Sequence, residues 1–546
     1  MIWLTSQYEG GNEMALTTEV LRPEIYRALE DVVGEEFISQ EPAILDSYSF
    51  VWGNELLYDG EKFSPRPLAV VLPGNTEEVQ AIVRLCNQHG IKFRPHASGF
   101  EITALSAPEG FLPLDLRRMN RILEIDEKNM YAVVEPYVSQ RNLMLEANKM
   151  GLRPNAFGAG GSTSMIATAC CHAGIGSTNV SAGHGGQLAL GVEWVLPDGE
   201  ILRLGTLGSR CGWFNGDGPG PSLRGVMRGY MGANGGHGVI TKAAIRLSPW
   251  YGPEKVNGRG SAPNFELKIP ENMKTYTLTW ETDEGLFEAF RLMAEEGIAH
   301  ALGRRGPFSA AAGVAGSTQE LEAVWNSGIY QEKFSHGAVC VLDAASPGEM
   351  EYKEGVMRKV LEKTGGHIHP EFNDPRQANS RFGYAYIGLG CLRSTFRTGT
   401  FFSTPAADEA GDVVSRVKYE GVKIKNEAEK EGVILNDGDS TFVTPLNEGS
   451  IGVHCEVVSR YDPSDKKAVK RVTEWIGKMN QAMLDKKMAI GGMEGCFIYN
   501  NDLHELFGPE CMNYDQWMKK IKMAFDPQNV GEASFYIVQD GSYKKD

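Results

Sequence analysis

The sequence predicts a protein of the α+β class made of two domains, and two patterns carry this prediction. From Pro67 onward, short apolar segments alternate with a helical segment, as they do in an α/β unit. After Pro249, apolar strand segments such as 338–342 and 450–458 alternate with amphipathic helical segments such as 466–484. The chain has 546 residues, of which 42% are hydrophobic and 23% charged, so it has the composition of a globular protein with room for more than one core.

Charge and cysteine content exclude several classes of function. Acidic residues outnumber basic ones by 70 to 54, and a net charge of -16 disfavours nucleic acid or an anionic membrane as the main partner. No apolar run reaches the ~18 residues of a membrane span, and residues 1–14 do not read as a secretion signal, so we expect a cytoplasmic protein. The nine cysteines include no Cys-x-x-Cys pair, which disfavours a disulfide scaffold or an iron–sulfur cluster.

The first domain contains well-marked elements. Asn75 and Glu78 form a capping-box pattern, apolar residues follow at helical spacing, and His89-Gly90 ends the helix. A second helix is expected over 138–152, and the turn Pro197-Asp198-Gly199 joins two strands in a hairpin. The strands are expected at 68–72, 91–93, 111–115, 122–125, 132–135, 188–196, 201–204 and 239–247.

The domain plan that we expect has four parts. Residues 1–60 form an N-terminal helical extension, 61–255 the first domain, 256–495 a second domain, and 496–546 a C-terminal segment that returns to the first domain. Residues 261–270 read as the linker between the two domains, and 514–525 as a short helix that ends before Asp526-Pro527.

Glycine-rich stretches in the first domain indicate a ligand that the backbone must approach closely. No Gly-x-Gly-x-x-Gly pattern occurs, so a Rossmann dinucleotide site is disfavoured. Four small-residue segments occur instead, at 94–100, 159–165, 171–174 and 234–240, which suits a long ligand extended across a sheet edge. The alternative is that each set of glycines only makes tight turns.

The order of these segments resembles one family. The stretches 94–100, 114–126, 132–136, 190–199 and 235–242 follow one another as in the FAD-binding domain of the vanillyl-alcohol oxidase and p-cresol methylhydroxylase superfamily, and 524–529 resembles its terminal Asp-Pro-x-Asn signature. The resemblance implies a two-subdomain FAD-binding domain of the p-cresol methylhydroxylase type and an antiparallel-sheet substrate domain, or cap.

By this resemblance the bound cofactor is FAD, with its pyrophosphate against the backbone of residues 95–99. The family often has three consecutive glycines in the first loop, whereas His96, Ala97 and Ser98 stand here. His96 is also a candidate for covalent attachment of the flavin. The cofactor-binding residues that the resemblance implies are Arg94, Pro95, His96, Ala97, Ser98, Gly99, Phe100, Ala159, Ser162, Thr163, Ser164, Met165, Cys171, Ala173, Gly174, Gly183, Asn234, Gly238, Val239 and Ile240.

The second domain supplies the candidate catalytic residues His454, Glu494 and Tyr499. Residues 447–465 resemble a strand of the glycolate and D-lactate dehydrogenase branch, in which two histidines and a glutamate hold a metal. His454 and Glu494 match two of those ligands, but Asn447 replaces the first histidine, and an amide is a poor zinc ligand, so we expect no metal. Tyr499 matches the tyrosine that holds phenolate substrates in the other branch, but Asn500 replaces its arginine partner.

Plainer interpretations stand beside these. His454 in an apolar strand can be an ordinary hydrogen-bonded histidine, and Glu494 can be solvent-exposed. The pair His367 and His369 provides only two possible metal ligands. Three arginines in a Gly- and Tyr-rich segment are candidates either for a carboxylate clamp or for structural or surface roles: Arg381, Arg393 and Arg397.

Three functions follow from the resemblance. The first is a FAD-linked dehydrogenase that takes hydride from a small alcohol, hydroxy-acid or aryl substrate and passes electrons to a separate protein acceptor, within a homo- or hetero-oligomer. The second is a FAD-dependent transferase of the alkylglycerone-phosphate synthase type. The third is a flavin subunit that only relays electrons in a larger complex.

Overall fold

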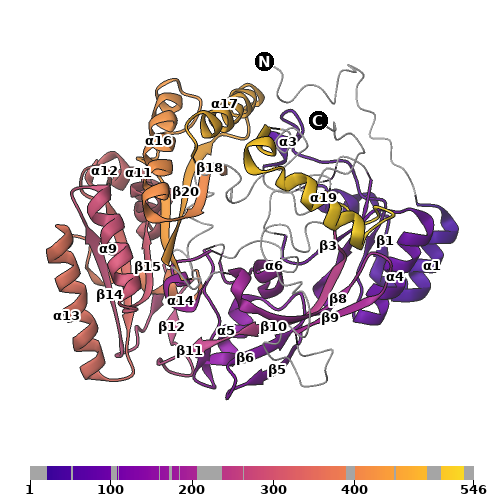
Figure 1. Ribbon diagram of the computed structural model, residues 1–546, viewed down its shortest axis with the longest axis horizontal. Helices are drawn as coiled ribbons and strands as arrows, with labels where there is room; N and C mark the ends of the chain where they lie inside the picture. The colour runs from indigo at the N-terminus through magenta and orange to yellow at the C-terminus, as the bar shows by residue number, and fades with distance from the viewer. Residues whose placement is uncertain are drawn as a thin grey trace.

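The computed structural model describes residues 21–50, 53–99, 107, 110–158, 160–170, 175–183, 185–205, 236–261, 264–388, 400–447, 451–488 and 506–533. Helices and sheets are mixed throughout, as predicted for the α+β class (Figure 1). The indigo-to-purple N-terminal half forms a part with two sheets, and a seven-stranded sheet with its helices lies beside it. We refer to these as the two-sheet domain and the cap.

The two-sheet domain begins with a four-stranded sheet of order β1-β2-β4-β3, in which β2, β4 and β3 run parallel. The second sheet is antiparallel, with order β5-β6-β10-β8-β9. The strands are β1 (Ile38–Ser39), β2 (Val70–Val71), β3 (Phe93–His96), β4 (Leu112–Asp115), β5 (Ile122–Asp126), β6 (Tyr131–Val134), β8 (Ala189–Val195), β9 (Ile201–Leu204) and β10 (Val239–Arg246). The short strands β7 (Leu152–Arg153) and β11 (Ser248–Pro249) form a separate pair.

Helices cover both sheets. Helix α4 begins as predicted, because the Asn75 side chain accepts a hydrogen bond from Glu78 N at 2.8 Å and donates one to the Glu78 carboxylate at 2.7 Å. It ends at Gly90, whose φ of 66° is the left-handed conformation that glycine adopts without strain. The helices of this domain are α1 (Pro23–Val33), α2 (Pro42–Ser47), α4 (Thr76–His89), α5 (Gln140–Asn148), α6 (Met165–Cys170) and α7 (Asn179–Ala182).

The C-terminal segment returns to the two-sheet domain. Helix α19 (Tyr514–Phe525) crosses above it in Figure 1, and the chain that follows lies beside β3. Phe93 N donates to Val530 O at 2.9 Å, and Glu532 N donates to Phe93 O at 2.8 Å. Residues more than 400 positions apart therefore share one sheet edge, which is the edge from which the first glycine-containing loop leaves.

The cap is a seven-stranded sheet of order β17-β14-β16-β15-β19-β20-β18. Every pairing within it is antiparallel, as expected for the cap. Its strands are β14 (Met273–Thr279), β15 (Ala299–Arg304), β16 (Gly337–Asp343), β17 (His367–Ile368), β18 (Thr400–Glu409), β19 (Thr441–Asn447) and β20 (Ile451–Tyr461), and a separate hairpin joins β12 (Gly258–Arg259) to β13 (Glu266–Leu267).

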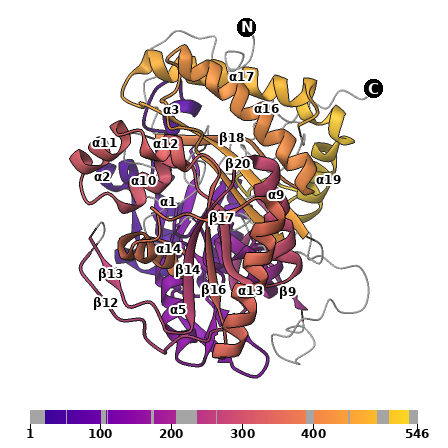
Figure 2. The ribbon, with the colours of Figure 1, turned by 90° about the vertical axis from the view of Figure 1, so that its left-hand side faces the viewer.

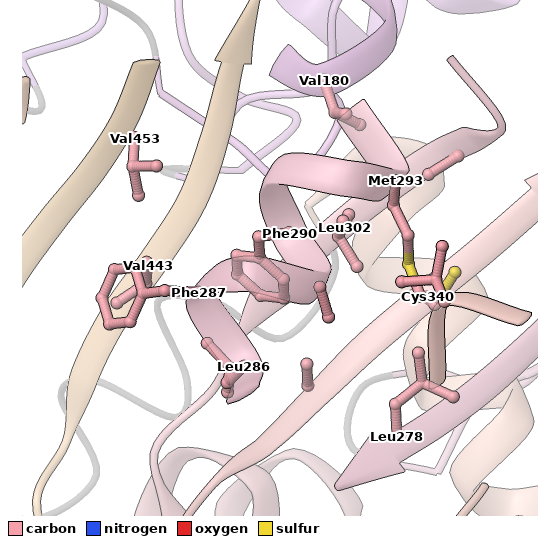
Figure 3. Close-up of a cluster of buried hydrophobic side chains, with 14 of the residues drawn as sticks. Val180, Leu278, Leu286, Phe287, Phe290, Met293, Leu302, Cys340, Val443 and Val453 are labelled. Atoms are coloured by element: carbon pink, nitrogen blue, oxygen red, sulfur yellow. The ribbon is translucent and has the colours of Figure 1, made fainter. Parts of the chain in front are cut away.

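The cap helices are α9 (Asp283–Glu295), α10 (Pro307–Val314), α11 (Thr318–Asn326), α12 (Ile329–Lys333), α13 (Pro347–Thr364), α14 (Pro375–Ile387), α16 (Gly411–Lys430) and α17 (Lys466–Asp485). Helices α9 and α13 lie in front of the sheet in Figure 2. They cover what we call the outer face, where alternate strand residues such as Leu302, Cys340, Val443 and Val453 join one hydrophobic cluster with Phe290 (Figure 3).

The opposite, inner face of the sheet has two regions. Over β14 and β16 it is covered by α14, whose Arg381 donates hydrogen bonds to the hydroxyls of Thr275 and Thr277. Over β15, β19, β20 and β18 the alternation places Gly303, Phe442, Thr444, His454, Glu456 and Asp408 on this face. Helix α14 lies between the sheet and the two-sheet domain in Figure 1, so the inner face is the side turned toward that domain.

Helix α7 of the two-sheet domain lies where β15 and β19 separate. The only registered pair between these strands is Arg304 with Val443. Beyond it, Leu302 N donates to Ser177 O at 2.8 Å, and Ser181 Oγ donates to His300 O at 2.7 Å. The two-sheet domain therefore satisfies backbone groups of the cap sheet directly.

The N-terminal extension contacts both domains rather than one. Helix α1 packs on α4 in the two-sheet domain through buried residues that include Leu29. The short helix α3 (Asn54–Leu57) instead packs on the cap, where Leu56 joins a cluster with residues of α17 and Tyr461 Oη donates to the Glu55 carboxylate at 2.8 Å.

Candidate functional site

The first loop leaves β3 later than the sequence predicts. Arg94, Pro95 and His96 are still paired with β4, so the loop begins at Ala97. Pro95 also has no N–H to offer, so the expected run of backbone donors shortens to 97–99. Gly99 has φ of 66°, and a Cβ on it would lie 2.6 Å from the His96 ring, so a side chain at 99 would push the imidazole out of place. The observed position of the His96 ring therefore requires a glycine at position 99.

A second loop meets the first one. Ser164 N donates to Ser98 Oγ at 3.0 Å, which joins segments that are 66 residues apart. The neighbouring backbone donors are used within the protein, because Thr163 N bonds Gly160 O and Met165 N bonds Val138 O. Ser162 is exposed, and Met165 points into the core beneath the five-stranded sheet.

The third segment is the start of β10. Gly238 has φ of 112°, and a Cβ on it would lie 2.1 Å from Val195 O. The side chains of Val239 and Ile240 point into two different hydrophobic cores, so only backbone is left facing outward here. Gly183 lies where the two domains pack closely. A Cβ on it would lie 2.7 Å from the Arg246 guanidinium and 3.3 Å from Asn447 O of the cap, so the close packing requires glycine here.

Buried polar atoms near the first two loops lack a partner among the described residues. They are His96 Nδ1 and Gln140 Nε2, and both side chains are next to the segments that the sequence assigns to the cofactor. Burial lowers the pKa of His96, although Asp115 opposes the effect, so the imidazole is neutral at pH 7. A neutral imidazole and an amide with open hydrogen-bonding positions, beside loops kept free of bulky side chains, fit a long polar cofactor.

The cap contributes a histidine held between two carboxylates. On the inner face of the sheet, His454 Nδ1 lies 2.6 Å from Asp408 Oδ1, and His454 Nε2 lies 2.9 Å from Glu456 Oε1. The His454 side chain is fully buried, while those of Asp408 and Glu456 retain 21% and 18% of their exposure. Ser403 Oγ donates to the second oxygen of Glu456 at 2.8 Å. We call these three groups the carboxylate–histidine cluster.

This cluster keeps His454 protonated. Burial alone would lower the pKa of His454, but Asp408 and Glu456 together outweigh it and raise the pKa to about 9. Because both ring nitrogens are engaged, His454 is not available as a metal ligand, and the described residues contain no group of three His, Cys, Asp or Glu side chains placed to hold a metal ion. With metal binding by His454 excluded, the cluster can still exchange protons through its two partly exposed carboxylates.

The raised pKa of His454 predicts a pH-dependent stability. The folded state binds this proton more tightly than the unfolded state, so the stabilisation is complete below about pH 6.5 and is lost as the pH rises toward about 9. The difference in unfolding free energy between the wild type and His454→Gln should therefore shrink over this interval. Urea unfolding at several pH values measures it, and a difference that stays constant from pH 6.5 to 9 would contradict the charged state that we assign.

Several predicted residues are placed elsewhere. Arg381 is a buried residue of α14 that points toward the sheet. Two threonine hydroxyls and Phe372 O accept its hydrogen bonds, so it stabilises the packing of α14 on the sheet. The rings of His367 and His369 stack with centroids 6.4 Å apart on the edge strand β17 and the turn after it. Other residues named from the sequence lie outside the described part of the chain: Phe100, Ala159, Cys171, Ala173, Gly174, Asn234, Arg393, Arg397, Glu494, Tyr499 and Asn500.

The sequence reasoning missed Asp408 and Glu456. Glu456 could have been found, because a residue two positions along a strand from His454 must share its face. Asp408 could not, because its register with His454 depends on β18 pairing with β20 across 46 residues.

The fold, the paired loops and the open polar atoms fit a long polar cofactor, and the comparison with known families identifies it. Residues 67–205 match the family described as the FAD binding domain, and FAD is the cofactor. The resemblance to the vanillyl-alcohol oxidase and p-cresol methylhydroxylase superfamily is thereby confirmed.

Individual relatives cover different parts of the chain. Glycolate oxidase subunit GlcD of Bacillus subtilis is 31% identical over 199 residues, which are 34% of this chain and 38% of that protein. D-2-hydroxyglutarate dehydrogenase of Xanthomonas citri pv. viticola is 25% identical over 352 residues, which are 62% and 69%. The structure of p-cresol methylhydroxylase has the same fold, with a TM-score of 0.73 and 17% identity over 95% of this chain and 98% of that one. No helix in the described ranges is both long enough and apolar enough to cross a membrane.

Proposed function

We propose that the protein is an FAD-dependent dehydrogenase that removes hydride from a small alcohol, hydroxy-acid or aryl substrate. The observation that carries this proposal is the carboxylate–histidine cluster on the inner face of the cap, on the side turned toward the domain that binds FAD. FAD, when bound, supplies a two-electron acceptor for that hydride. The names of GlcD and D-2-hydroxyglutarate dehydrogenase support an oxidation of this kind.

The cap residues supply the proton acceptor. Oxidation of an alcohol to a carbonyl releases one proton with the hydride, and a base must take it. The partly exposed carboxylates of Asp408 and Glu456 can accept that proton, while the shared proton on His454 keeps both of them positioned and limits their repulsion. Because the imidazole hydrogen-bonds both carboxylates, its proton is shared within the cluster.

The two-sheet domain holds the cofactor. The backbone of 97–99 and the Ser98–Ser164 contact lie beside His96 and Gln140, which supply a neutral acceptor and a donor. Electrons then leave to a separate protein acceptor, since the sequence offers no haem or iron–sulfur motif, and the protein acts within an oligomer.

Anaerobic reduction tests the proposal. The FAD-loaded protein is titrated under argon with glycolate, D-lactate, D-2-hydroxyglutarate and 4-cresol, and the flavin absorbance is followed. Bleaching together with formation of the oxidised product supports a dehydrogenase. Consumption of a substrate without net oxidation would instead support the transferase alternative, and bleaching by a reduced partner protein but by no small molecule would support the electron-relay alternative.

A further inference from the structure

Arg305 is a buried cation that has no carboxylate partner among the described residues. It directly follows β15, retains 7% of its exposure, and donates from Nη2 to Ser309 O at 3.1 Å. Its guanidinium stands over the Tyr384 ring with Cζ 4.8 Å from the centroid. Its hydrogen bond to Ser309 O uses one of five N–H groups, and stacking on an aromatic ring engages the face of the guanidinium and not its edge, where the donors are.

Two nearby buried arginines of the cap are neutralised by aspartates of the protein, whereas Arg381 is held by hydroxyls and a carbonyl. Arg304 is paired with Asp439 at 2.8 Å, and Arg460 contacts the Asp437 carboxylate at 2.5 Å. Burying a charge is costly unless an opposite charge or several hydrogen bonds compensate for it. Arg305 differs from Arg304 and Arg460 because no described residue supplies it with a carboxylate, which suits a residue that receives an anion from outside.

The fold places Arg305 on the same face as the carboxylate–histidine cluster. Gly303 is on the inner face, and Arg305 is two residues further along the same direction. Arg304 of β15 pairs with Val443 of β19, and Val443 pairs with Cys455 of β20. Because both pairings are antiparallel, Arg305 lies level with Glu456 of β20, with β19 between them. At the usual strand spacing the two backbones are about 9–10 Å apart.

The ring of Tyr384, which stacks on Arg305, lies near the glycine-rich part of the FAD-binding domain. A Cβ on Gly158 would lie 3.4 Å from Tyr384 Oη, and one on Gly388, just after α14, would lie 2.6 Å from Phe157 O. The ring that supports Arg305 therefore touches the FAD-binding domain. Arg305 and the cluster therefore share the inner face of the cap sheet, on the side turned toward the FAD-binding domain.

We propose that Arg305, supported by the Tyr384 ring, binds the carboxylate of the substrate. This rests on the proposed function and narrows it to substrates that carry a carboxylate near the carbon to be oxidised. A planar guanidinium pairs with both oxygens of a carboxylate, which fixes the orientation of a small acid as well as its affinity. The hydroxyl end of such an acid would then lie toward Asp408, His454 and Glu456.

Binding of oxalate, a small dicarboxylate that carries no hydroxyl to oxidise, tests this directly. Oxalate is titrated into the FAD-loaded protein at constant ionic strength, and binding is followed by the flavin difference spectrum and by the thermal midpoint. Arg305→Met should weaken binding about tenfold to a hundredfold, and Arg305→Lys, which keeps the charge but not the planar fork, should fall between. Arg376→Met is the matched control, because Arg376 is an exposed arginine paired with Glu320.

The outcomes separate this proposal from the proposed function. Equal oxalate affinity in the wild type and in a folded, flavin-loaded Arg305→Met, or no oxalate binding to the wild type, overturns the proposal. If Arg305→Met does not fold, Arg305→Lys is the deciding variant. An unchanged affinity of Arg305→Lys for oxalate, together with an unchanged KM for hydroxy-acids, also overturns the proposal. Oxalate binding that depends on Arg305 in a protein that no substrate reduces would sustain this proposal and reject the dehydrogenase.

Discussion

Replacing Asp526 by alanine is expected to lower the free energy of unfolding by about 3–5 kcal/mol and to reduce the amount of bound FAD. Asp526 is fully buried and accepts hydrogen bonds from Lys522 Nζ, from Val530 N and from Gly531 N at 2.7 Å. Without it, the buried charge of Lys522 keeps the carbonyls of Gly236 and Gly531 as its hydrogen-bond partners within the described ranges. The turn that brings the C-terminal segment to β3 would also lose two of its hydrogen bonds.

The measurement is urea unfolding followed by circular dichroism, together with flavin content after gel filtration. The double variant Lys522→Met with Asp526→Ala is the control, because removing both ions should cost less than the sum of the two single changes. Additive losses would show that the pair is not coupled, and full FAD content in Asp526→Ala would show that this turn does not support the cofactor loop.

Replacing Glu456 by glutamine is expected to lower kcat by about 10²- to 10⁴-fold, the usual contribution of a positioned acid or base. Glutamine fills the same volume and can keep the contact with Ser403, but it removes one of the two charges that raise the pKa of His454. The flavin content and the thermal midpoint should change little by comparison. The matched control is Glu409→Gln, at the exposed end of β18.

A second readout distinguishes a catalytic role from a purely structural one. The pKa of His454, followed by NMR of its ring signals, should fall from about 9 in Glu456→Gln, because the carboxylate at 2.9 Å no longer favours the charged form. A lower pKa with unchanged kcat would mean that the cluster only supports the sheet. An unchanged pKa would mean that Asp408 alone holds the proton.

Local signals in the sequence predicted the elements that local physics determines. The Asn75–Glu78 capping pair, the hairpin between β8 and β9, and the helices α17 and α19 lie where they were expected, since caps, turns and apolar periodicity act over a few residues. Helix α5 is shorter than the predicted 138–152 at both ends, because Ser139 caps its start and its last residue is Asn148.

The candidate site was harder to predict because its parts meet only in the folded chain. His454 was found from its resemblance to a family motif, but its state depends on Asp408 of another strand. Arg381 was a candidate either for a carboxylate clamp or for a structural role, and the helix register turns it toward the sheet, where hydroxyls hold it. Arg305 gave no signal in the sequence, because only the folded structure shows that no carboxylate of the described ranges pairs with it.

The position of α7 constrains how this protein can be engineered. Residues 177–181 belong to the FAD-binding domain, yet they complete backbone pairing in the cap sheet where β15 and β19 diverge. A chimera that exchanges the cap of one relative for that of another would leave these groups mismatched if the crossover points followed the domain borders. Exchanging residues 175–183 along with the cap should give the better-folded hybrid.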